Sequence, residues 1–138
     1  MLFDMTSEVT YLGDLRTQSK HIASQSEILS DAPTDNNGKG EAFSPTDYVA
    51  NALASCMLTI MGIKAREMNV DMSQSRAEVT KIMQAEPRKI ATIEVKIFMS
   101  PEVEAKTKTI LENAAKACPV AKSLHPDIVQ KIEFIWKN

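Results

Sequence analysis

The sequence predicts an α+β fold: three short strands, a long apolar helix, a pair of strands, an amphipathic helix and a last strand, in that order. Two observations support this fold class. Short segments alternate apolar and polar residues, as strands do, and two longer segments carry apolar residues at helical spacing. The 138 residues fit a single domain over 1–138, because the sequence contains neither an internal repeat nor a linker.

The N-terminal part is predicted to form three strands, over residues 8–13, 15–22 and 26–30. A loop follows over residues 31–43, DAPTDNNGKGEAF, because Asp, Asn, Gly and Pro each favour turns.

The strongest local signal is a helix start. Ser44 can cap the helix, Pro45 suits its first position, and Asp47 completes a capping box. The helix is predicted to end near Asn69, and it is apolar on nearly every face between residues 48 and 63. Such a helix is buried on all sides. Because a chain of this size has little material to surround it, we expect a homodimer.

Residues 76–84 and 90–99 are predicted to pair as an antiparallel hairpin with one solvent-exposed face. The last strand is predicted over residues 128–136. Between these strands, Ser100-Pro101 is expected to open a second helix, which Pro119 ends. Its apolar stripe comprises Val103, Thr107, Ile110, Leu111, Ala114 and Cys118.

Composition excludes some function classes. The net charge is −2, with 16 basic and 18 acidic residues and no basic block, so nucleic-acid binding has no electrostatic support. The N-terminus does not resemble a secretory signal. The apolar run over 48–63 is too short to span a membrane and is interrupted by polar residues. We therefore expect a cytoplasmic protein without a membrane partner, in which a disulfide would be transient.

The two cysteines are the candidate reactive groups. Cys56 lies about three turns into the long helix, too far from its start to benefit from the helix dipole. A single buried cysteine is most often a small apolar residue of the core. Cys118, however, lies on the inward stripe of the second helix, so both thiols are predicted to face one interior. They could form a disulfide there, or they could be two independent core residues.

Two segments resemble signatures of the OsmC/Ohr family. FSPTDYVANALASCMLTIMGIKA, residues 43–65, is similar to the family's central helix, in which a Cys follows eleven residues after a proline, as Cys56 follows Pro45. NAAKACPVAKSL, residues 113–124, resembles the second signature, with Cys-Pro at the end of a helix. The order of elements agrees too, so the resemblance covers nearly the whole chain.

The resemblance implies an intertwined homodimer with antiparallel sheets around two buried central helices. It also implies a thiol-dependent peroxidase of the oxidative stress response, acting on organic hydroperoxides and, as a further candidate, hydrogen peroxide. Cys56 would attack the peroxide and become a sulfenic acid. Cys118 would condense with it to a disulfide, and a thiol reductant would restore both cysteines.

A buried thiolate needs a cation, and Arg suits because it stays charged when desolvated. Family members use an Arg from the N-terminal strands, and Arg16 in GDLRTQ is the best match. The alternatives are that Arg16 is an ordinary exposed residue, or that the cation is Arg66 or Lys64, which lie further along the helix of Cys56. The Ohr branch carries a Glu after the Asn-Pro to orient this Arg. Here Thr46 stands at that position, so the chain is nearer the broad OsmC-like group.

Two other functions remain open at this point. One is a non-catalytic dimer whose interface binds an apolar or thiol-bearing small molecule. The other is a different thiol chemistry, such as sulfur transfer or electrophile detoxification. No cofactor is expected. No metal is expected either, because His21, Cys56, Cys118 and His125 lack the short spacing of zinc ligands.

Overall fold

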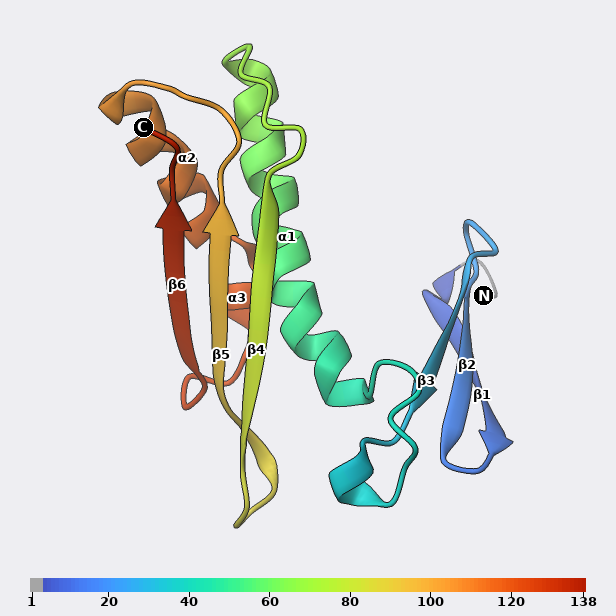
Figure 1. The fold of residues 1–138 in the computed structure, drawn as a ribbon. Helices are drawn as coiled ribbons and strands as arrows, with labels where there is room; N and C mark the ends of the chain where they lie inside the picture. The colour runs from blue at the N-terminus through green and yellow to red at the C-terminus, as the bar shows by residue number, and fades with distance from the viewer. Residues whose placement is uncertain (1–3) are drawn as a thin grey trace. The chain divides into compact units, whose positions relative to one another are not determined.

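A computed structural model describes residues 4–138. The chain divides into two compact units: the first ends at Tyr48, and the second runs from Val49 to Asn138 (Figure 1). Each is described by itself below.

The first unit contains a three-stranded antiparallel sheet in the order β1-β2-β3. The strands lie within one residue of the predicted segments: β1 is Ser7–Gly13, β2 is Arg16–His21 and β3 is Glu27–Asp31. Val9 and Tyr11 of β1 lie on the same face as Ile28 of β3, and all three are exposed. One face of this sheet therefore carries three exposed apolar side chains.

The loop after β3 folds back on itself around the short 3-10 helix η2, Thr34–Asn36. A side chain at Gly38 would lie 1.7 Å from the carbonyl oxygen of Ala32, so only glycine fits there. The predicted capping box then starts α1, Pro45–Glu67. The Ser44 N–H donates to Asp47 Oδ2 at 3.0 Å, and the Asp47 N–H donates to Ser44 Oγ at 3.1 Å. The predicted helix start is confirmed.

Within one chain, helix α1 is buried along one stripe and not on all sides. The sequence prediction left the remaining faces to a second subunit, and this cover stays a prediction. The buried stripe comprises Ala50, Leu53, Ala54, Met57, Met61 and Ala65. Val49 and Ile63 remain exposed. The 23 residues of α1 are long and apolar enough to span a membrane. The prediction from the sequence considered only the shorter apolar run over residues 48–63, which is too short. The length and composition of α1 are weak support for a span, because the core helix of a soluble protein meets the same criterion.

The second unit contains a three-stranded sheet in the order β4-β5-β6, made of Arg76–Gln84, Lys89–Phe98 and Val129–Ile135. The β4–β5 hairpin is antiparallel, as predicted. Strand β6 pairs parallel with β5, so this sheet is mixed and the expectation of purely antiparallel sheets is corrected. The two intervening helices carry the chain back to the end where β5 begins, which is the crossover that parallel pairing needs.

The core of the second unit lies between this sheet and the helices on one of its faces (Figure 1). Ile93, Val95 and Ile97 of β5 are completely buried. Met61 of α1 and Leu111 of α2, the helix Ala105–Lys116, complete the centre of the same cluster. The α+β fold class predicted from the sequence is confirmed.

Helix α2 covers Ala105–Lys116 and begins later than the predicted start at Ser100-Pro101. Ser100 has another role: its hydroxyl donates to the Ser73 carbonyl at 2.7 Å, and its N–H donates to Ser75 Oγ at 2.9 Å. It therefore ties the ends of β4 and β5 together. A short helix, α3, follows over Pro119–Ser123.

Candidate functional site: a pair of thiols

Cys56 lies in the middle of α1 and is half-buried. It is seven residues from both Val49 and Ile63, which is close to two helical turns in each direction. The three side chains therefore lie on one face of the helix, the face that carries exposed apolar groups. The Cys56 side chain packs against the edge of the core from this face, so it can be reached from outside the chain.

Cys118 is completely buried and lies between two helices, not on α2 as the sequence predicted. Helix α2 ends at Lys116 because Pro119 lacks an N–H and would clash with the preceding turn. Pro119 instead occupies the first position of α3, and Cys118 is its N-cap. The Ala121 N–H donates to Cys118 Sγ at 3.5 Å.

The structure brings the two cysteines together. Both are free thiols, and their side chains form a hydrogen bond. Burial raises the pKa of the Cys118 thiol, and the hydrogen bond with Cys56 and the charge of Cys56 raise this pKa further. The Ala121 N–H opposes these effects. Cys118 is therefore held in its protonated form beside Cys56.

The pair is unequal in a way that suits redox chemistry. Cys118 is inaccessible and protonated, whereas Cys56 is half-buried and adjacent to an exposed face. An oxidant from solution reaches Cys56 first. A disulfide can then form without either side chain crossing solvent, because the two thiols already lie in contact.

Arg16, the predicted cation, lies at the start of β2 in the first unit, and the cysteine pair lies in the second. Its guanidinium forms ion pairs with Asp31, at 3.5 Å, and with Glu41. Sequence reasoning identified neither carboxylate, because they lie 15 and 25 residues from Arg16 and no local pattern links them.

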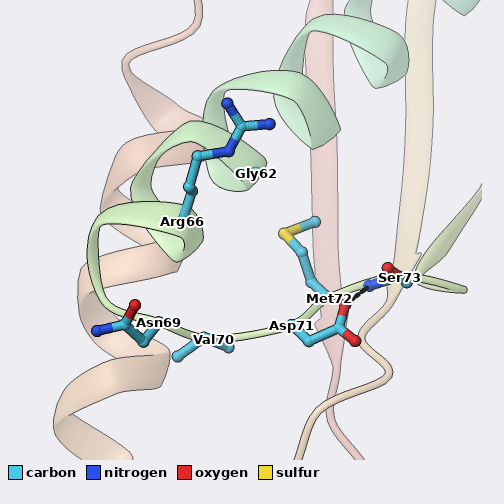
Figure 2. A pocket seen from close by; sticks show the side chains of 7 residues that line it. All are labelled: Gly62, Arg66, Asn69, Val70, Asp71, Met72 and Ser73. Atoms are coloured by element: carbon cyan, nitrogen blue, oxygen red, sulfur yellow. Dashed lines mark hydrogen bonds between the residues drawn. The ribbon is translucent and has the colours of Figure 1, made fainter.

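Arg66, the competing cation, lines an open pocket of about 440 Å³ in the second unit. Figure 2 shows its guanidinium pointing away from the carboxylate of Asp71. Hydrogen bonds from Ser73 lower the pKa of Asp71. Arg66 is ten residues from Cys56, about 15 Å along the helix axis. This pocket contains neither cysteine; it is lined by Gly62, Arg66, Asn69, Val70, Asp71, Met72 and Ser73.

Within residues 4–138, no cluster of three or more His, Cys, Asp or Glu side chains could hold a metal ion. His21 pairs instead with the Ser24 hydroxyl at 2.7 Å, and His125 accepts the Asp127 N–H at 3.0 Å.

Comparison with known proteins identifies relatives along most of the chain. Residues 38–133 match the family described as OsmC-like protein. A protein from Psychrobacter arcticus 273-4, provisionally described as an osmotic stress induced and detoxification response protein, is 56% identical, with a TM-score of 0.91 over 94% of this chain and 95% of that one. No curated protein matches the sequence closely enough to be a relative.

More distant structures share the fold alone. The organic hydroperoxide resistance protein OsmC from Legionella pneumophila superimposes with a TM-score of 0.70 at 14% identity, over 95% of this chain and 97% of that one. The organic hydroperoxide resistance protein OhrB of Bacillus subtilis gives a TM-score of 0.64 at 17% identity, over 94% and 98%.

Proposed function

Because the chain belongs to the OsmC-like family, we propose that it is a cysteine-based hydroperoxide reductase in which Cys56 reacts with the peroxide and Cys118 resolves the product. The observation that supports this most strongly is the contact between two thiols of unequal burial. The relatives called organic hydroperoxide resistance proteins share the fold and favour the same class of reaction.

In the oxidative half-reaction, the Cys56 thiolate attacks the terminal oxygen of ROOH. The O–O bond breaks, the alkoxide leaves as ROH after taking up a proton, and Cys56 becomes a sulfenic acid. The Cys118 sulfur then attacks the Cys56 sulfur, an S–S bond forms, and water leaves. Since the thiols already lie in contact, this step protects Cys56 from further, irreversible oxidation.

In the reductive half-reaction, an external thiol attacks the accessible sulfur, Cys56. The Cys118 sulfur leaves with the electron pair of the S–S bond, beside the Ala121 N–H that stabilises its negative charge. A second thiol, or the second group of a dithiol, then releases Cys56 and carries away the oxidised reductant as a disulfide. A cytoplasmic location would supply such thiols.

The exposed face of α1 supports a homodimer. Val49 and Ile63, on either side of Cys56, are 37% and 54% exposed within one chain. Isolated apolar residues on a surface are ordinary, but these two share one helix face with a reactive group. A second subunit packed against this face would cover them and enclose Cys56 in a water-poor pocket suited to an organic peroxide.

The deciding experiment is a steady-state peroxidase assay of the reduced protein. Hydrogen peroxide and an alkyl hydroperoxide are compared, each with a dithiol and with a monothiol reductant. We expect peroxide-dependent turnover that Cys56→Ser abolishes, with the alkyl hydroperoxide preferred. Absence of turnover with every pair would reject the proposal and favour a binding protein or another thiol chemistry.

A further inference from the structure

A pocket of about 250 Å³ lies in the second unit, at the end of the sheet where β5 and β6 end and β4 begins. Figure 1 shows these strand ends at the arrowheads of β5 and β6. The strand register forms the pocket, because Phe98 of β5 lies opposite both Arg76 of β4 and Ile135 of β6. This sheet-end pocket contains neither cysteine.

The floor of the sheet-end pocket is apolar and is formed by Phe98, Met99, Ile135 and Trp136. Met99 is buried, whereas the other three side chains are half-buried, so part of their apolar surface remains within reach of a ligand. The indole of Trp136 is held in place, because its Nε1 donates to Glu112 Oε2 at 2.8 Å. A concave apolar floor with a fixed lining favours the apolar body of a small molecule.

The remaining lining side chains are cationic or neutral. They are Gln74, Arg76, Ser100 and Lys137, and no carboxylate is among them. The Arg76 guanidinium lies over the ring of Phe98, with Cζ 4.1 Å from the ring centroid, and its Nη1 donates to Glu78 Oε2 at 2.8 Å. The ammonium of Lys137, in contrast, has no hydrogen bond or ion pair to any residue within 4–138. An apolar floor beside one fixed cation and one unpaired cation is complementary to an anion.

From this arrangement we propose that the sheet-end pocket binds a short-chain alkyl carboxylate. The alkyl chain lies against Phe98 and Ile135, and the carboxylate pairs with Lys137 in the positive field of Arg76. An alkyl chain fits better than an aromatic ring, because the guanidinium of Arg76 already covers one face of Phe98. The pocket is smaller than typical ligand sites of about 300–1,000 Å³, so its ligand has roughly ten non-hydrogen atoms or fewer.

Trp136 is the only tryptophan of the chain, so its fluorescence reports directly on this pocket. Titration of the full chain with hexanoate should give a saturable change with a Kd of about 1–10 mM, as expected for so small a ligand. From propanoate to hexanoate, each added methylene should tighten binding by about 3- to 4-fold until the floor is covered. Hexylamine, which has the same chain and the opposite charge, should bind more weakly. Hexylamine binding as tightly as hexanoate, or no saturable change with hexanoate, would overturn the proposal.

The variant Lys137→Gln tests the pairing. It removes the charge from an exposed residue next to the C-terminal position, so the fold should be kept, and hexanoate should bind about 3- to 10-fold more weakly. Lys131→Gln is the matched control, because Lys131 is an exposed lysine of the same strand that lies outside the pocket. It should bind hexanoate like the wild type. If Lys137→Gln also binds like the wild type, or if both variants lose affinity equally, Lys137 does not hold the carboxylate and the proposal is wrong.

Backbone amide NMR locates the bound hexanoate. Chemical-shift changes should be concentrated in residues 98–100 and 135–137. Changes centred on residues 49–63 of α1 would place hexanoate beside Cys56 and overturn the sheet-end site. None of these measurements involves turnover. A wild type without peroxidase activity would therefore leave this proposal standing, and a failed titration would leave the proposed peroxidase function standing.

Discussion

The thiol of Cys118 is completely buried and hydrogen bonded to the thiol of Cys56, which lies on the exposed face of α1. This relationship assigns different chemistry to two residues of the same type. Burial and the neighbouring Cys56 raise the pKa of Cys118, so it remains a thiol when Cys56 reacts. In the proposed mechanism, the accessible partner meets the oxidant, and the buried one receives the product.

The first prediction concerns the resolving thiol. In Cys118→Ser, Cys56 should be oxidised once, and the catalytic cycle should then stop, because no second sulfur lies beside Cys56 to form a disulfide. Mass spectrometry after one equivalent of an alkyl hydroperoxide should find a sulfenic or over-oxidised Cys56 in the variant and a Cys56–Cys118 disulfide in the wild type. If both wild-type thiols stay free while peroxide is consumed, the two-cysteine mechanism is wrong.

The second prediction concerns stability at alkaline pH. The pKa of Cys118 is raised in the folded protein, so above about pH 8.5, where a free thiol ionises, the unfolded chain loses this proton before the folded one does. The free energy of unfolding should therefore fall as the pH rises through this range, until the pH exceeds the pKa of Cys118 in the folded protein.

Urea unfolding of the reduced protein between pH 7 and 10.5 measures this effect. Cys118→Ala removes the titrating group and should flatten part of the fall, which separates it from the contribution of lysines and tyrosines. An identical pH dependence in this variant would contradict the raised pKa.

Local signals in the sequence were sufficient for most elements. The capping box at Ser44 and Asp47 involves residues three apart, and the alternation in β5 reports directly which side chains face the core. Helix α2 was harder, because Ser100 looks like a cap from sequence but is bound by Ser73 and Ser75, which lie just before β4 and are 27 and 25 positions away. The parallel pairing of β6 depends on the crossover and could not be read from a single strand.

The candidate site was only partly predictable for the same reason. Cys56 and Cys118 are the two cysteines of the chain, so they could be named from sequence alone. Their contact depends on the interruption of the helix before Pro119. Because of it, Cys118 is the N-cap of α3 and not a residue within α2. The ion pair between Arg16 and the buried Asp31 could not be predicted, because burial and strand register have no local signature.

The third prediction concerns assembly. A charge placed on the exposed face of α1 should break the proposed dimer, because it would be buried without a partner in the interface. Ile63→Glu should therefore shift sedimentation at micromolar concentration from dimer to monomer or unfolded chain. Ile82→Glu is the matched control, since Ile82 is 42% exposed and lies on β4, not on α1. A wild type that sediments as a stable folded monomer would reject the dimer.

The last prediction concerns the cation, and it separates Arg16 from Arg66. Replacing Arg16 with Met keeps most of the apolar stem and deletes the charge, so packing is largely preserved. If Arg16 stabilises the charge that develops in the reaction with peroxide, kcat/KM should fall by about 100-fold or more, as when one fixed donor is removed from an active site.

Arg16→Lys should recover only part of this loss, because an ammonium lacks the planar fork of the guanidinium and costs more to desolvate. Arg66→Met is the matched control: Arg66 lines the open pocket at the end of α1, about 15 Å along the helix from Cys56. Single-turnover oxidation of Cys56, followed by quenching and thiol labelling, measures the rate for each variant without interference from the reductant. If Arg16→Met reacts as fast as the wild type and Arg66→Met does not, the cation that assists Cys56 is Arg66.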